Sequence, residues 1–262
     1  MTDSTRSDRG EPAFEFAAVA LAYASQPVLQ AVDLVVEPGE SVALIGPSGA
    51  GKTTWMRLAN GTLIATAGRV CFEGLDFARA SQAALRSARA RIGCVHQTPS
   101  LVPNLRVVQN VVAGALGRRG FASAVRALVR PSRVDTERAH ALLERVGIAD
   151  KLFDRTDRLS GGQAQRVALA RALFQDPRAL LADEPVASVD PERARSMIEL
   201  CLQVAREAGC TLIASLHDHE LARSAFERVV GLREGRVVFD RASADVEDAE
   251  LAALYRLPES AG

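Results

Sequence analysis

A short glycine-rich segment constrains this chain more than any other part of its sequence. It matches the pattern G-x-x-x-x-G-K-[ST], which is typical of loops that bind phosphate groups. Its residues are Gly46, Pro47, Ser48, Gly49, Ala50, Gly51, Lys52, Thr53 and Thr54. An apolar run over residues 41–45 predicts a buried strand before the loop, and residues 53–59 predict the start of a helix after it. This order predicts an α/β fold with a phosphate site at the loop.

The glycines of this loop let the backbone curl so that successive N–H groups point inward at a polyphosphate. The helix that begins at Lys52 adds the positive end of its dipole there. The Lys52 ammonium can then reach the outer phosphates, and the Thr53 hydroxyl can ligate Mg²⁺. Composition favours this interpretation over a plain turn. The chain has thirty arginines and only two lysines, yet the loop keeps lysine, whose compact ammonium fits inside a ring of backbone amides.

The overall composition is that of a soluble protein. The 262 residues suffice for one large domain or a domain with a sub-lobe, and 48% of them are apolar. The formal net charge is zero, so no global field favours a nucleic acid or an anionic membrane, and we expect no nucleic-acid partner. No apolar run is long enough to span a bilayer. Cys71, Cys94, Cys201 and Cys210 show no C-x-x-C pairing, which predicts buried, reduced thiols in the cytosol.

The pattern along the chain predicts three parts. Residues 1–12 are polar and are expected to be disordered, residues 13–240 form the main domain, and residues 241–262 form a short tail. Within the domain, partial alternation over residues 13–36 predicts strands with one buried face. Helical spacing of apolar residues predicts that residues 98–158 form a helical subdomain inserted in the α/β core.

An acid-free segment lies inside this predicted helical subdomain. Between residues 115 and 134 it carries Arg118, Arg119, Arg126, Arg130 and Arg133. Such a basic segment could face phospholipid headgroups or an acidic partner. A solvated helical face is the interpretation that we favour.

Four apolar segments of the chain alternate with predicted helices, which is typical of a parallel sheet with helices on both faces. They end at Gly46, Gln97, Asp183 and His217. In such sheets the ligand lies at the carboxyl ends of the strands. The sequence therefore predicts that a phosphate loop, an amide, two carboxylates and an imidazole meet at one edge.

Each of these polar residues has a predicted chemical role beside a bound nucleotide. Asp183 ends a strand too apolar to be exposed, so its carboxylate needs compensation, and Mg²⁺ held by Thr53 and the phosphates would supply it. Glu184 is then free to orient and deprotonate an attacking water. His217 is a candidate to contact the γ-phosphate, or else an ordinary core histidine. Gln97 either bridges the metal and the water or simply ends its strand.

A second candidate anion site precedes another predicted helix. Its residues are Leu159, Ser160, Gly161, Gly162 and Gln163. The spacing of Ser160 and Gln163 fits a capping box, which is a purely structural explanation. The two glycines also leave the positive end of the helix bare, which suits an anion. The loop of residues 46–54 already binds the phosphates of this chain's own nucleotide. The second site is therefore expected to contact the nucleotide bound to another subunit.

Tyr23 is predicted to lie in a turn between two N-terminal strands. Its flat ring could stack on an adenine base, or it could be an ordinary surface aromatic. The sequence leaves these two interpretations open.

Together these segments resemble the ATP-binding cassette (ABC) ATPases, in family order and from Tyr23 to about Phe239. The matching segments are the Walker A loop (46–54), the Q-loop residue Gln97, the signature motif (159–163), the Walker B strand with its catalytic glutamate (180–184), the D-loop residues Ser188 and Asp190, and the switch residue His217.

The resemblance implies a P-loop NTPase (RecA-like) fold, with an N-terminal antiparallel β subdomain and an inserted helical subdomain. It implies hydrolysis of ATP to ADP and phosphate with Mg²⁺ as cofactor. It also implies a head-to-tail homodimer, in which each ATP lies between the Walker A loop of one subunit and the signature motif of the other. The implied partners are integral-membrane permease subunits, contacted near Gln97, and through them a periplasmic or extracellular solute-binding protein. The implied location is peripheral, at the cytoplasmic face of the plasma membrane.

Three sequence segments are similar to those in the ATPase subunits of bacterial phosphonate importers. They are residues 101–105, 182–188 and 216–218. The chain departs from the family pattern at Val189, where Leu is usual, at Ala164, where Gln is common, and at Thr98, where an aromatic often follows the Q-loop glutamine. The alternatives are a transporter for an amino acid, for phosphate or for lipoprotein release, or a soluble cassette acting on ribosomes or DNA. The last ranks low because the chain has one cassette and no long coiled-coil insertion.

Overall fold

The computed structural model describes residues 10–24, 26–185 and 191–256. Most of the segment predicted to be disordered, residues 1–12, lies outside the described residues. So do Ser188 and Asp190 of the predicted D-loop. The two predictions are not tested by this structure.

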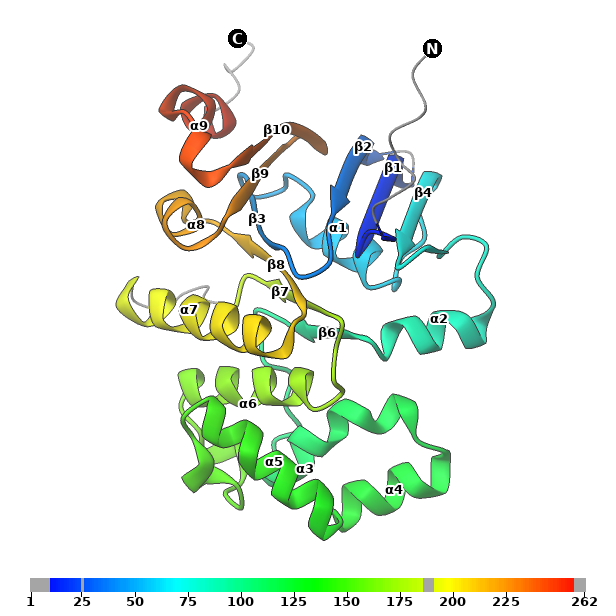
Figure 1. Cartoon of the computed structure of the whole chain (residues 1–262), viewed down its shortest axis with the longest axis vertical. Coiled ribbons are helices and arrows are strands. Elements are labelled where there is room, and N and C mark those ends of the chain that lie inside the picture. The colour runs from blue at the N-terminus through cyan, green and yellow to red at the C-terminus, as the bar shows by residue number, and fades with distance from the viewer. Residues whose placement is uncertain (1–9, 25, 186–190, 257–262) are drawn as a thin grey trace.

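A six-stranded sheet forms the centre of the molecule (Figure 1). Its strands are β3 (Ser41–Ile45), β6 (Ile92–Val95), β7 (Ala179–Asp183), β8 (Thr211–Leu216), β9 (Arg228–Arg233) and β10 (Arg236–Ala242). Their order across the sheet is β10-β9-β3-β8-β7-β6, and only β10 pairs with its neighbour in antiparallel fashion. The prediction of a parallel core from four apolar segments is confirmed.

Helices and a second sheet cover both faces of this central sheet, which explains why its inner parallel strands are predominantly apolar. Alternate residues of β3 enter two separate cores. Val42 and Leu44 join the core with α1 (Lys52–Ala59) and α2 (Gln82–Arg89). Ala43 and Ile45 join the core on the other face. The helices there are α6 (Gly161–Leu173), α7 (Pro191–Ala208) and α8 (His219–Ala225).

The N-terminal part forms the expected antiparallel sheet, seen at the upper right of Figure 1. Its strands, in the order β2-β1-β4-β5, are β1 (Phe14–Tyr23), β2 (Gln26–Val36), β4 (Ala67–Phe72) and β5 (Leu75–Asp76). Phe16 of β1 stacks on Trp55 of α1, with ring centroids 4.4 Å apart. Because Trp55 is completely buried, this contact fixes the sheet against the helix that follows the glycine loop.

The segment between β6 and α6 is helical, as its periodicity predicted, and lies at the bottom of Figure 1. Its elements are α3 (Val107–Val112), η1 (Ala113–Arg118), α4 (Phe121–Val129), α5 (Arg133–Arg145), η2 (Ala149–Lys151) and η3 (Thr156–Arg158). Asn110 is buried in α3, where it accepts a hydrogen bond from Val102 N–H at 2.8 Å. This bond fastens the preceding loop to the helical part.

The C-terminal segment differs from the short tail that the sequence predicted. The boundary expected at residue 240 falls inside β10, and η4 (Ser243–Asp245) and α9 (Asp248–Tyr255) follow. Leu251 and Leu254 of α9 are buried in the main core. These apolar residues close over the end of the sheet, so the described part of this segment is packed into the fold. Among the described residues, no helix combines the length and the hydropathy needed to span a bilayer.

Candidate functional site

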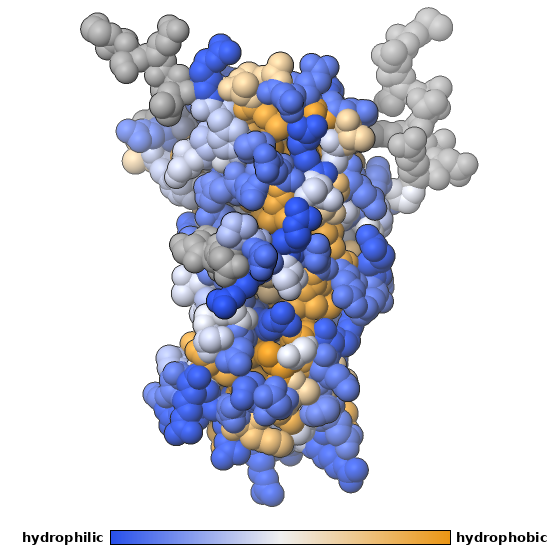
Figure 2. Space-filling view, turned by 90° about the vertical axis from the view of Figure 1, so that its left-hand side faces the viewer, coloured by the Kyte–Doolittle hydropathy of each residue, from blue (hydrophilic) through white to orange (hydrophobic). Residues whose placement is uncertain are grey.

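The carboxyl ends of the parallel strands meet at one edge of the central sheet. β3 leads into the glycine loop, β6 into Gln97, β7 into Asp183 and Glu184, and β8 into His217. Figure 2 views the molecule from the left-hand side of Figure 1, where α7 begins, and shows hydrophilic side chains around a band of apolar ones. The strand ends inferred from the sequence to converge therefore lie at one edge of the sheet.

Lys52 is drawn into the glycine loop rather than into solvent. Its side chain is only 4% exposed, and Nζ donates hydrogen bonds to Gly46 O at 2.7 Å and Pro47 O at 3.3 Å. Nζ also lies 3.8 Å from Glu184 Oε1. Burial lowers the pKa of the Lys52 ammonium, while Glu184 and Asp183 oppose that effect. The ammonium is thus held beneath the loop, next to the carboxylates of β7.

Two glycines of the loop are required by the chain around them. A Cβ at Gly46 would lie 2.0 Å from Leu232 O, because β9 passes directly beside the loop. Gly51 has φ +104°, and a Cβ there would lie 2.7 Å from Leu29 Cδ2. Side chains at either position would therefore push the loop out of the conformation that presents its N–H groups inward.

Asp183 and Thr53 lie together, as predicted for a metal site. The Thr53 hydroxyl donates to Asp183 Oδ1 at 3.4 Å, and a hollow of about 110 Å³ is lined by both residues. One carboxylate and one hydroxyl, completed by water and phosphate oxygens, are the hard donors that Mg²⁺ prefers. The residues present therefore fit Mg²⁺. Gln97, the third predicted ligand, is exposed, and no contact joins its side chain to these two within the described residues.

Glu184 and His217 face each other across the end of the sheet. His217 Nε2 lies 2.6 Å from Glu184 Oε1. The Glu184 backbone adopts a φ of +48°, a left-handed conformation that is uncommon for residues other than glycine. Its N–H is held by Ser215 through the hydroxyl at 2.9 Å and the carbonyl at 3.2 Å. Strained backbone of this kind concentrates at functional sites, and here it turns Glu184 away from Asp183 toward the imidazole.

Ser215 holds the Asp183 carboxylate and the Glu184 backbone, a role that the sequence analysis missed. Its hydroxyl donates to Asp183 Oδ1 at 2.7 Å while accepting from Glu184 N–H, and its side chain is completely buried. The available signal was a hydroxyl in the apolar strand beside the Asp-Glu pair. Parallel pairing then sets Ser215 directly opposite Asp183.

We expect Ser215→Ala to lower ATP turnover by about tenfold or more, because the carboxylates lose the group that positions them. The cost in folding stability should be about 1–3 kcal/mol, the usual range for an unpaired buried acceptor. Turnover per folded molecule and thermal unfolding are the measurements. Thr211→Ala is the matched control, because Thr211 is a buried hydroxyl at the opposite end of the same strand. Equal turnover in both variants would contradict a positioning role for Ser215.

The loop that begins at Gln97 is held by α6. Gln165 Nε2 donates to Gln97 O at 2.8 Å, and the Arg171 guanidinium donates to Pro99 O at 2.8 Å and Ser100 O at 2.9 Å. Burial lowers the pKa of Arg171. The loop expected to contact a partner is therefore fastened to the same helix whose N-terminus carries the second candidate anion site.

The second candidate site has the predicted capping box. Ser160 Oγ accepts from Gln163 N–H at 3.3 Å, and Gln163 Oε1 accepts from Ser160 N–H at 3.0 Å. A Cβ at Gly161 or Gly162 would meet no atom within 4 Å. These glycines are therefore not required by the chain's own packing, and the first N–H groups of α6 stay open to an outside ligand.

Two tyrosines, Tyr23 and Tyr255, differ in their surroundings. Tyr23 is 45% exposed and is the last residue of β1 rather than a turn residue, paired with Gln26. Tyr255 of α9, which the sequence analysis did not single out, donates to His217 O at 3.3 Å. Burial raises the pKa of its phenol, and the nearby Gly46 backbone opposes that rise. The C-terminal helix thus braces both the loop and the histidine.

Several arginines of the acid-free segment form ion pairs or hydrogen bonds within the chain. Arg119 pairs with Asp135 at 2.5 Å, Arg133 with Glu137 at 2.7 Å, and Arg118 donates to Ala90 O at 2.7 Å. The Arg119 guanidinium holds the pKa of Asp135 below its usual range. These contacts indicate that many arginines of the segment stabilise the fold. They do not form a uniform basic surface.

Comparison with known proteins identifies the family. A family model described as "ABC transporter" matches residues 29–187. A protein of Anaeromyxobacter dehalogenans named "Phosphonates import ATP-binding protein PhnC" is 46% identical over 244 residues, which are 93% of this chain and 48% of that protein. This chain thus spans about half the length of that relative. A protein of the same name from Frankia casuarinae is 46% identical over 246 residues, 93% of this chain and 96% of the relative.

Solved structures share the fold along nearly the whole chain. The cbiO1 protein of Clostridium perfringens, part of the ABC transporter complex cbiONQ, has a TM-score of 0.78 and 27% identity, covering 93% of this chain and 94% of that one. A dimeric post-hydrolysis state of the ATP-binding cassette MJ0796 bound to ADP and Pi has a TM-score of 0.73 and 27% identity, covering 88% of this chain and 98% of that one.

Proposed function

This chain belongs to the ABC transporter family, and on that premise we propose that it is the ATP-hydrolysing subunit of an importer that takes up phosphonate through a separate permease. The observation that carries the proposal is the edge where the strands end. There Lys52 lies 3.8 Å from Glu184, Glu184 lies 2.6 Å from His217, and Asp183 shares a hydrogen bond with Thr53. A cationic cradle, a base and a metal-binding pair are the parts that phosphoryl transfer to water needs.

In the proposed reaction the loop of residues 46–54 holds the phosphates, and the Lys52 ammonium leaves its carbonyl partners to contact the outer ones. Mg²⁺, bound by Thr53 and Asp183, would neutralise phosphate charge. Glu184 Oε1 accepts a proton from the attacking water. His217, hydrogen-bonded to Glu184, holds that carboxylate and approaches the γ-phosphate. Gln97 is proposed to orient the water and to complete the metal site, and Tyr23 is proposed to stack on adenine.

We further propose that the active form is a head-to-tail homodimer. The open helix end at Gly161 and Gly162 suits the γ-phosphate of an ATP bound to the partner's glycine loop. The dimeric MJ0796 cassette bound to ADP and Pi supports this arrangement, since it shares the fold of this chain. Leu159, Ser160 and Gln163 would complete the contact in trans, and Ser188 and Asp190 are proposed to join the two subunits.

Replacing Ser160 by Phe tests the part of the nucleotide site that the partner subunit would supply. We expect the variant to bind ATP as a monomer with unchanged affinity but to lose most of its hydrolysis, because the ring fills the space of the partner's γ-phosphate. Ser160→Ala is the control, since it removes the same helix cap, at a cost of about 1 kcal/mol, without adding bulk. If the Phe variant hydrolyses ATP at the rate of the parent protein, Ser160 is a helix cap and nothing more.

The proposed partners are permease subunits docked near the Gln97 loop and a solute-binding protein that delivers phosphonate to them. The protein would then lie at the cytoplasmic face of the plasma membrane as a peripheral subunit. The test is ATPase stimulation in vesicles that contain the permease, with the binding protein loaded with methylphosphonate. Stimulation by methylphosphonate and not by an amino acid supports the proposal. The reverse result would assign the chain to another solute.

A further inference from the structure

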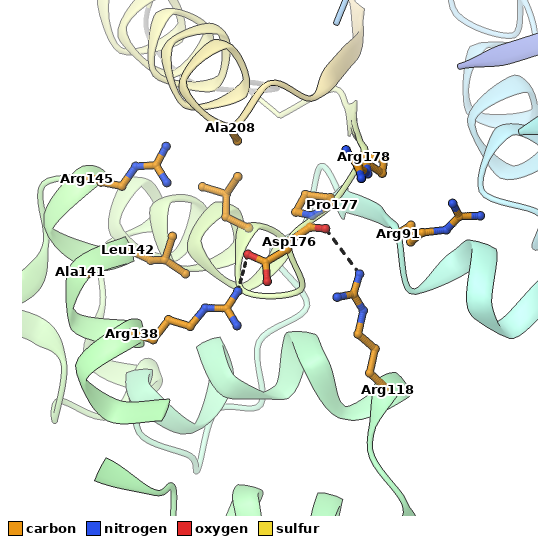
Figure 3. Close-up of a pocket in the computed structure, with 11 residues that line it drawn as sticks. Arg91, Arg118, Arg138, Ala141, Leu142, Arg145, Asp176, Pro177, Arg178 and Ala208 are labelled. Carbon is orange, nitrogen blue, oxygen red and sulfur yellow. Dashed lines mark hydrogen bonds and ion pairs between the residues drawn. The ribbon is translucent and has the colours of Figure 1, made fainter. Parts of the chain in front are cut away.

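An arginine-lined pocket lies at the opposite edge of the central sheet from the proposed nucleotide site. It has a volume of about 650 Å³, within the range of ligand pockets. Its charged lining residues are Arg91, Arg118, Arg138, Arg145, Arg178 and Asp176 (Figure 3). Arg91 and Arg178 directly precede β6 and β7, so they mark the amino ends of the parallel strands. The pocket is therefore separate from the site of the ATPase reaction.

Three of the five guanidiniums are neutralised by carboxylates. Arg138 lies 2.5 Å from Asp176, and Figure 3 shows its side chain reaching from α5 to that carboxylate. Arg145 pairs with Glu207 at 2.9 Å. Arg91 points away from the centre of the pocket in Figure 3 and pairs with Glu73. These pairs leave little charge of their own to attract a ligand.

The other two guanidiniums have no carboxylate partner within the described part of the chain. Arg118 donates only to the carbonyls of Ala90 at 2.7 Å and Asp176 at 3.4 Å. The side chain of Arg178 makes no hydrogen bond or ion pair with the described residues, although its backbone N–H donates to Arg91 O at 2.7 Å. Two uncompensated cations therefore share one concavity, which focuses a positive potential there.

We propose that this pocket binds a small phosphorus oxyanion in its dianionic form, of the phosphate or phosphonate class. Two uncompensated guanidiniums match a charge of minus two, and the planar fork of arginine suits pairs of phosphoryl oxygens. Arg118 belongs to the helical part and Arg178 directly precedes β7 of the core, so the pocket is lined from both parts of the fold. This inference goes beyond the ATPase role and does not depend on which solute the transporter carries.

The test is binding of inorganic phosphate and of methylphosphonate to the protein held in a saturating non-hydrolysable ATP analogue and Mg²⁺, so that the glycine loop and the γ-phosphate position are both occupied. Titration calorimetry gives the affinity, and thermal unfolding gives the shift in Tm. Sodium chloride at equal ionic strength is the control for general salt effects. Phosphate and methylphosphonate share the same phosphoryl oxygens, so both should bind. The one that binds more tightly indicates whether the pocket takes free phosphate or a phosphonate.

Arg178→Gln is the decisive variant, because its side chain has no described contact to lose on folding. We expect it to weaken oxyanion binding about tenfold or more. Arg118→Gln should do the same, with some loss of stability from its carbonyl bonds. Arg133→Gln is the matched control, since Arg133 is exposed and pairs with Glu137 outside the pocket. Equal affinity in Arg178→Gln, Arg133→Gln and the parent protein, or a Tm shift that sodium chloride reproduces, would overturn the proposal.

Discussion

Replacing Glu184 by Gln is expected to lower ATP turnover by a factor of about 10² to 10⁴, the range that a positioned general base contributes. The amide cannot take a proton from water, but it keeps the shape of the carboxylate and its contact with His217. ATP binding should therefore persist, and the trapped nucleotide should hold two subunits together. Phosphate release and size-exclusion chromatography with ATP and Mg²⁺ measure the two effects.

Glu220→Gln is the matched control for this variant. Glu220 is an exposed acid on α8, three residues beyond His217, and should tolerate the same change without loss of turnover. If Glu184→Gln hydrolyses ATP at the parent rate, the base must be another group. The 2.6 Å contact with His217 would then have only a structural purpose.

Replacing Lys52 by Ala is expected to weaken ATP binding about 10- to 100-fold. The ammonium makes charge-assisted hydrogen bonds of about 1.5–3 kcal/mol each, and it has no substitute in the loop. Because Lys52 is buried and bonded to Gly46 O, the variant also leaves a loop carbonyl without its donor. Nucleotide affinity by equilibrium titration is the measurement.

The only other lysine provides the control for this experiment. Lys151 lies in the helical part beside Asp150 and Asp154, and these carboxylates raise its pKa. Lys151→Ala removes the same charge from the chain and should leave ATP affinity unchanged. Equal affinity of the two variants would contradict the assignment of residues 46–54 as the phosphate cradle.

The sequence predicted the central sheet and the meeting of its strand ends because both follow from local patterns. The predominantly apolar runs that end at Asp183 and His217 are buried on both faces, as in a parallel sheet covered by helices. Once the strands are parallel, their carboxyl ends share an edge. Thr53, Asp183, Glu184 and His217 were therefore placed together without knowledge of the strand order.

The supporting contacts could not be predicted in the same way, because they depend on strand order and on packing between distant segments. Ser215 reaches the Asp183 carboxylate and the Glu184 N–H, 32 and 31 residues away in the chain, only because β8 lies next to β7. Gln165 reaches the Gln97 carbonyl across 68 residues. The sequence around Leu251 carries a short amphipathic pattern, but a pattern of this length does not show that Leu251 and Leu254 pack into the main core.

The most direct test of the account is a structure of the Glu184→Gln protein with ATP and Mg²⁺. We expect the triphosphate in the loop of residues 46–54, with Lys52 against its outer phosphates and the metal between Thr53 and Asp183. The helix end at Ser160 to Gln163 of a second subunit should close over the γ-phosphate. A nucleotide bound away from the carboxyl ends of the strands, or enclosed by one subunit alone, would contradict the account.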